Sequence, residues 1–97
     1  MPALPRGTRF VRGSGDHKYT VILPDGKRVS FGHKSYQHYR DSVPRNLGGG
    51  IWSKLNHNDP TRRASYRARH GALMCKNGKK CITVKYSPAW FSYYFLW

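Results

Sequence analysis

Apolar and polar positions alternate on both sides of a short polar segment in the first third of the chain. Residues 17–23 and 28–32 are rich in β-branched and aromatic side chains, and the Pro-Asp-Gly-Lys sequence at 24–27 suits a tight turn. In two such strands one face collects the large apolar side chains, namely Tyr19, Val21, Leu23, Val29 and Phe31. The pattern predicts a β-hairpin over residues 17–32, which needs another element to cover that face.

A second hairpin is expected farther along the chain. Residues 72–75 and 81–86 contain β-branched and apolar side chains on either side of an Asn-Gly dipeptide, which is typical of tight hairpin turns. In this arrangement Cys75 and Cys81 fall opposite each other. We favour two free thiols. A cross-strand disulfide and a zinc site with nearby histidines are the alternatives, although the cysteine spacing matches no common zinc finger.

The strongest helix signal spans residues 59–71. Asp59 (or Asn58) can cap such a helix, Pro60 fits its first turn and Gly71 fits its end. Arginines on neighbouring turns repel one another and weaken an isolated helix of this length. An anionic partner would relieve that repulsion.

Other local signals are weaker. Ser87 and Pro88 suit the N-cap and first position of a last short helix. Residues 35–41 favour a short helix that ends before the next proline, and residues 51–55 favour a helical turn. The three glycines at 48–50 predict a loop that either moves or lies tightly against a neighbouring segment.

The N-terminal residues combine glycines and prolines with an arginine at every third position from Arg6 to Arg12. This composition favours an extended arm that lies on a partner. The predicted fold class is therefore α+β, in one small domain at residues 17–97. The domain is expected to contain two β-hairpins and two or three short helices, preceded by the extended basic arm at residues 1–16.

Positive charge changes this picture most. Lys and Arg number 18 against four Asp and no Glu, which gives a formal net charge of +14. Such an excess favours a polyanion or an acidic protein surface as partner. The candidate contacts are the arginines of the predicted helix and arm: Arg62, Arg63, Arg67, Arg69, Arg6, Arg9 and Arg12. Because arginine binds phosphates and carboxylates alike, the sequence leaves both kinds of partner open.

Aromatic side chains fill most positions of the C-terminal segment. The candidate core or docking residues are Trp90, Phe91, Tyr94, Phe95 and Trp97. We favour a helix that packs them into the domain's own core, because the rest of the chain is poor in large apolar groups. Docking into a neighbouring subunit is one alternative. Binding at a membrane surface is another, although no Lys or Arg follows Lys85.

Motifs for catalysis or cofactor binding are not recognisable in the sequence. The segment Asn56-His57-Asn58 resembles only a fragment of a ββα nuclease motif, without the carboxylates that such a site needs. We therefore expect no enzymatic activity, no cofactor and no metal. No apolar stretch reaches the ~18 residues that span a membrane. The two cysteines and the lack of a signal peptide favour a reduced, intracellular protein.

Three longer segments stand out in this order: His17–Gly32 (HKYTVILPDGKRVSFG), Asn56–Gly71 (NHNDPTRRASYRARHG) and Lys85–Trp97 (KYSPAWFSYYFLW). Together they resemble a family of small basic proteins from nucleocytoplasmic large DNA viruses of the chlorovirus and iridovirus type. The resemblance covers roughly residues 17–97 and carries no assigned activity with it. It implies a virion or infected-cell protein, since several small proteins of these viruses are minor capsid components.

The sequence-level hypothesis is accordingly a structural minor capsid protein of a large double-stranded DNA virus, which cements capsomers from inside the shell. Its expected partners are the major capsid protein and other minor capsid proteins within a large assembly, with DNA as a further candidate. Its expected location is the virion capsid, and the host cytoplasm during assembly. The alternative is a sequence-independent DNA-binding protein of the viral core, acting through its basic surface.

Overall fold

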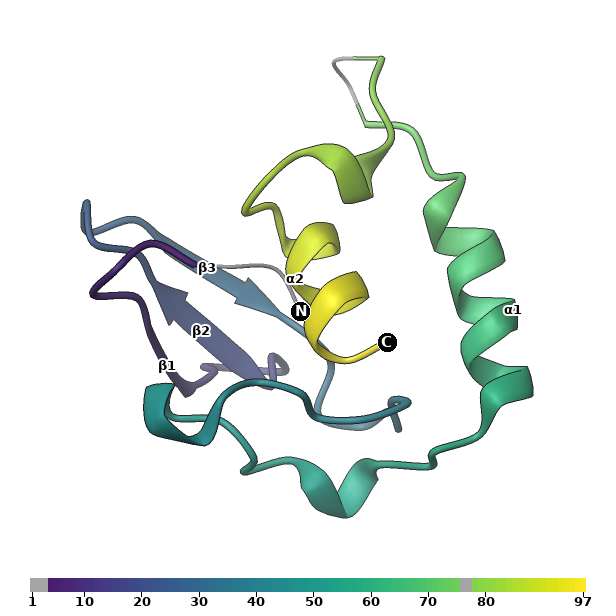
Figure 1. Ribbon diagram of the computed structural model, residues 1–97, viewed down its shortest axis with the longest axis horizontal. Coiled ribbons are helices and arrows are strands. Elements are labelled where there is room, and N and C mark those ends of the chain that lie inside the picture. Colours follow the sequence, from purple (N-terminus) through teal and green to yellow (C-terminus); the bar gives the residue numbers. More distant parts are fainter. Residues whose placement is uncertain (1–3, 76–77) are drawn as a thin grey trace.

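Three short strands form an antiparallel sheet in the computed structural model, which describes residues 4–75 and 78–97. The strands β1 (Arg9–Arg12), β2 (Tyr19–Ile22) and β3 (Arg28–Phe31) lie side by side in chain order (Figure 1). β2 and β3 are the two strands of the hairpin predicted over residues 17–32. With two helices, the strands make a small α+β domain.

Strand β1 lies within the segment predicted to be an extended arm, and that prediction is wrong for Arg9–Arg12. Phe10 pairs with Val21 of β2, and its side chain is buried in the core. Two apolar residues between arginines are a weak strand signal, so the surrounding glycines and prolines dominated the sequence pattern. Residues 1–3 of the predicted arm lie outside the described residues.

Helix α2 (Pro88–Phe95) covers the apolar face of the sheet (Figure 1). It begins as predicted, because the Ser87 hydroxyl accepts a hydrogen bond from the Trp90 amide. Phe91 stacks on Phe31 of β3 at a ring-centroid distance of 5.3 Å. The buried apolar core consists of Phe10, Tyr19, Val21, Leu23, Val29, Phe31, Val43, Trp90, Phe91, Phe95 and Leu96.

Helix α1 (Pro60–Gly71) lies outside α2, on the side away from the sheet (Figure 1). The Asp59 carboxylate caps it by accepting from the amides of Thr61 and Arg62, so its start is as predicted. None of its residues is fully buried. The helix therefore presents a broad face to solvent, with only one side held by the rest of the chain.

The second predicted hairpin is wrong in most of its length. One bridge joins Met74 to Lys80, and then Cys81–Thr83 form a 3-10 helix, η3, instead of a strand. This segment packs on α1 and α2, and that packing overrides its β propensity. The predicted turn includes residues 76–77, which lie outside the described residues. The favoured interpretation of two free thiols is also wrong, because Cys75 and Cys81 form a disulfide.

The long connection from β3 to α1 contains two 3-10 helices, η1 (Arg45–Leu47) and η2 (Ser53–Leu55). η2 lies within the predicted helical turn. The short helix predicted for residues 35–41 is wrong, since this stretch consists of turns and bends and His38 forms a bridge with Asn56. Contacts with a distant segment replace the local hydrogen bonds that a helix would make.

Close backbone approach explains the glycines of this connection. A Cβ at Gly48 would lie 2.0 Å from the Phe10 carbonyl oxygen, and one at Gly49 would lie 2.0 Å from that of Val43. Of the two predicted behaviours, the loop therefore shows tight packing against β1. No helix in the described part of the chain is both long and apolar enough to cross a membrane.

Candidate functional site

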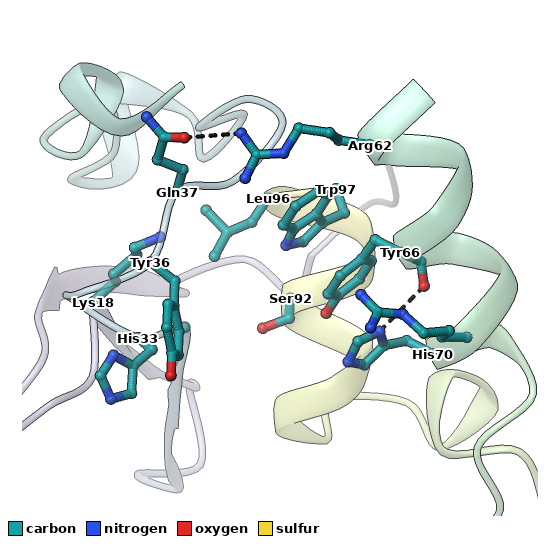
Figure 2. A pocket seen from close by; sticks show the side chains of 12 residues that line it. Lys18, His33, Tyr36, Gln37, Arg62, Tyr66, His70, Ser92, Leu96 and Trp97 are labelled. Carbon is teal, nitrogen blue, oxygen red and sulfur yellow. Dashed lines mark hydrogen bonds between the residues drawn. The ribbon is translucent and has the colours of Figure 1, made fainter. Parts of the chain in front are cut away.

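A hollow of about 680 Å³ lies between helix α1, helix α2 and the loop that follows β3 (Figure 2). We call it the basic hollow, because its charged lining residues are all cationic: Lys18, Arg62 and Arg69. Two histidines, His33 and His70, also line it. The rest of the lining is aromatic, polar or apolar, namely Tyr36, Tyr66, Trp97, Gln37, Ser92, Gly32 and Leu96. None of the described residues that line it is acidic.

Helix α1 brings four of these side chains to one face. Arg62, Tyr66, Arg69 and His70 are spaced at i, i+4, i+7 and i+8, which lie above one another on an α-helix. Arg62 and Arg69 are both exposed at the surface. They stand about two turns apart, so the face offers two separate cations with an aromatic side chain between them.

Tyr66 is the centre of a column of stacked rings. Its ring lies 3.8 Å from that of His70 and 4.1 Å from that of Trp97, nearly parallel to both. The His70 Nδ1–H donates to the Tyr66 carbonyl oxygen at 3.1 Å. Burial raises the pKa of the Tyr66 phenol, so the ring stays neutral at physiological pH. This column attaches α1 to the end of α2 and forms one wall of the basic hollow.

The opposite wall comes from the loop after β3. His33 and Tyr36 lie across from Tyr66 and His70, with Ser92 of α2 between the two sides (Figure 2). The Tyr36 ring packs against the His33 ring at a centroid distance of 4.7 Å, yet Tyr36 is 68% exposed. A large aromatic side chain is thus left open to solvent beside the hollow.

Arg62 connects the two walls at their outer edge. Its Nη1 donates a hydrogen bond to Gln37 Oε1 at 2.9 Å (Figure 2). The bond leaves the remaining N–H groups of the guanidinium free to face an anion, since arginine carries five donors.

Lys18 lies beneath the hollow and is almost completely buried. Its Nζ donates to His38 Nδ1 at 2.7 Å, and His38 Nε2 donates to Asn56 Oδ1 at 2.6 Å. Asn56 Oδ1 is only an acceptor, so His38 is the neutral tautomer with its proton on Nε2. Burial lowers the pKa of Lys18 to about 8, although the charge of Asp41 opposes this. Lys18 is therefore still mostly protonated at pH 7.

Burial, together with the neighbouring Lys18 charge, lowers the pKa of His38 to about 4. The nearby Asp41 carboxylate accepts from the Tyr19 hydroxyl at 2.5 Å and from the Trp52 amide at 3.0 Å. These bonds fasten the long connection to the sheet. The carboxylate is occupied by these structural contacts and does not line the hollow.

The predicted arginines separate into two groups. Arg62 and Arg69 line the basic hollow. Arg63 and Arg67 turn to the chain itself: their Nε atoms donate to the Trp97 main-chain oxygen at 2.7 and 3.1 Å. Their guanidinium groups also lie over the rings of Tyr39 and Tyr93, at 4.7 and 4.4 Å. These two arginines hold α1 in place.

Arg6, Arg9 and Arg12 lie away from the hollow. All three are exposed, and Arg12 lies over the Trp52 ring at 4.7 Å. They add positive charge near β1, at a different place from the arginines of α1. The structure therefore does not bring the two predicted groups of arginines into one site.

The predicted aromatic residues are mostly structural. Trp90, Phe91 and Phe95 lie in the core, and Trp97 belongs to the ring column. Tyr94 is 38% exposed on the outer side of α2. The segment therefore has the favoured role as core in this structure.

Sequence reasoning did not place Lys18 or His33 at the site. Lys18 precedes a strand, where a polar residue is expected to face solvent, and no local pattern marks its burial. His33 and Tyr36 become part of the wall only because their loop faces α1. Within the described residues, no group of three or more His, Cys, Asp or Glu is placed to hold a metal ion.

Comparison with known proteins gives one partial match. Residues 11–46 match a family of unknown function, DUF5754. The matched part includes β2 and β3 and the loop wall of the basic hollow, but not α1 or α2. No match was found among curated proteins or among solved structures.

Proposed function

We propose that this chain is a binding protein rather than an enzyme, and that it binds nucleic acid through the phosphates without reading base sequence. The observation that carries the proposal is the basic hollow, where cations and aromatic rings line one concave surface and acidic side chains are missing from the lining. The net charge of +14 adds long-range attraction for a polyanion.

The aromatic side chains favour nucleic acid over an acidic protein as the partner. Arginines alone bind carboxylates and phosphates equally well. The exposed Tyr36 ring offers a stacking surface, and Arg62 and Arg69 supply cations that line the same hollow. Proteins combine these two features to bind single-stranded nucleic acid.

A minor capsid role is the second candidate. Leu73 and Met74 are 51% and 59% exposed beside the disulfide, and such a pair suits contact with another protein. Together with the resemblance to proteins of large DNA viruses, this supports a virion protein that contacts the major capsid protein and other minor capsid proteins. Its location would be the capsid, and the host cytoplasm during assembly. The aromatic segment is a poor docking peptide here, since Trp90, Phe91 and Phe95 are buried.

Binding to labelled oligonucleotides of unrelated sequence, followed by fluorescence anisotropy, tests the first proposal. A protein that contacts about six phosphates should lose on the order of 10³ in affinity for duplex DNA between 50 and 200 mM salt. Arg69→Gln should reduce the slope of log K against log salt by about one. Lys54→Gln is the matched control, because Lys54 is exposed on η2 and outside the hollow.

Absence of binding at 50 mM salt would overturn the proposal of nucleic-acid binding. The capsid role is tested separately, by stripping purified particles with detergent and moderate salt and following the chain by mass spectrometry. Retention in the stripped shell supports the capsid role, and release with the DNA supports binding to the genome. Absence from particles would overturn both the capsid role and the role as a genome-binding protein of the virion.

A further inference from the structure

We infer that the basic hollow takes up one unpaired nucleotide, with the base against Tyr36 and the phosphate near Arg62 and Arg69. The inference deepens the proposed function and rests on it, since it names the part of a nucleic acid that this site receives. A surface that only attracts phosphates needs no concave site lined by aromatic rings. The basic hollow is such a site, so its geometry suits a base as well as a phosphate.

The size of the hollow suits this ligand. Its volume of about 680 Å³ lies within the ~300–1,000 Å³ range of small-molecule pockets. The hollow lies between two helices and a loop, so it admits a single planar group that leaves the stack of neighbouring bases. A paired base stays in the double helix and does not reach such a site without unpairing.

The two walls differ in what they offer to a base. The Tyr66 ring has both faces covered, by His70 and by Trp97, so this column presents mainly ring edges. Tyr36 has His33 on one side only and is 68% exposed, so its other face is available for stacking. Figure 2 shows these walls facing each other across the hollow. A base stacked on Tyr36 would therefore meet ring edges opposite, a favourable edge-to-face contact.

The cations are placed for the phosphate of the same nucleotide. Arg62 stands at the rim, where Gln37 orients its guanidinium at 2.9 Å. Arg69 stands two turns farther along the same helix face. Lys18 adds positive charge from below, although its ammonium group is engaged by His38. Thus the aromatic wall and the cations can contact one nucleotide at the same time.

Base binding and phosphate binding can be distinguished with three labelled ligands, each about 12 nucleotides long. They are oligo-dT, an abasic strand with the same number of phosphates, and a duplex. At 50 mM salt, oligo-dT should bind at least about 5-fold more tightly than the abasic strand, because only it offers a base to stack. Tyr36→Ala should weaken oligo-dT binding by about 5- to 100-fold and leave abasic binding unchanged. The control Tyr94→Ala should change both affinities less than about 2-fold.

Nuclear magnetic resonance locates the site in the same samples. Oligo-dT should shift the Trp97 indole signal and the backbone signals of Tyr36 more than those of Val29, which lies in the core. The same spectra show whether the Tyr36→Ala variant stays folded, which we expect because Tyr36 is exposed. Competition with free thymidine monophosphate identifies the source of the nucleotide: displacement at micromolar concentration indicates a free nucleotide, and weaker displacement indicates a residue within a strand. Both results agree with the inference.

Equal affinity for oligo-dT and the abasic strand, with no effect of Tyr36→Ala, would overturn the inference and leave the proposed nucleic-acid binding intact. Perturbations confined to surfaces other than the hollow would also overturn it. If none of the three ligands binds at 50 mM salt, the proposed function itself fails, and the inference fails with it.

Discussion

Protonation of His38 should destabilise the fold, and the structure sets the size of the effect. The ring is completely buried and its Nδ1 accepts from the Lys18 ammonium at 2.7 Å. A second proton on the ring would turn this acceptor into a donor and place two positive charges side by side. Burial, and after it the Lys18 charge, is why the pKa of His38 falls from 6.5 to about 4.

The sign and the magnitude follow from proton linkage. Between pH 6.5 and 4 the unfolded chain binds a proton at His38 that the folded chain does not, so the free energy of unfolding falls as the pH falls through this window. Each pKa unit corresponds to about 1.4 kcal/mol, which gives about 3 kcal/mol over the whole window. About 2 kcal/mol of this should be lost between pH 7 and pH 5, before most carboxylates titrate.

Guanidinium unfolding followed by tryptophan fluorescence at pH 7 and pH 5 measures this loss. His38→Gln should lower the stability at pH 7 yet remove most of its pH dependence, since the amide can still donate to Asn56 and accept from Lys18. His17→Gln is the control, because His17 is exposed and its replacement should leave the pH dependence intact. Burial also lowers the pKa of His57, so a smaller dependence of stability on pH should remain in both variants. Equal loss in the parent protein and in His38→Gln would refute the reasoning.

Three other perturbations test the fold. Phe91→Ala should lower the free energy of unfolding by about 3–5 kcal/mol, against about 1 kcal/mol or less for the partly exposed Tyr94→Ala, and similar losses would contradict the assigned core. Gly48→Ala should cost about 2 kcal/mol or more in the same assay, because the new Cβ would meet the Phe10 carbonyl, whereas Gly15→Ala, which has open space, should cost less. Reduction of Cys75–Cys81 should cost about 2 kcal/mol by thermal unfolding, and a Cys75→Ser/Cys81→Ser double variant should not respond to reductant.

Elements with their own start and stop residues could be predicted from the sequence. Asp59 and Pro60 begin α1, and Ser87 and Pro88 begin α2, because caps act through contacts within a single turn. Segments that depend on a distant partner could not. Strand β1 exists because Phe10 pairs with β2, and η3 replaces a strand because it packs on two helices. Local propensity carries no information about either contact.

The candidate site was predictable in its charge but not in its geometry. The sequence indicated the four arginines of α1, yet it could not separate Arg62 and Arg69, which line the hollow, from Arg63 and Arg67, which hold Trp97. That division depends on where the last residue of the described chain lies. Lys18 was missed for a related reason, since its burial is created by the connection that carries His38.

The core of this domain joins the two ends of the sequence, and this has a consequence for the order of folding. The β-sheet displays the rings of Phe10 and Phe31 as soon as its three strands pair, but Phe91 covers them only when the far end of the chain arrives. Contacts between such distant positions form slowly, because a long loop must close first. An early folding state with an uncovered aromatic sheet would therefore be prone to self-association, and the strong like charge of the chain would oppose it.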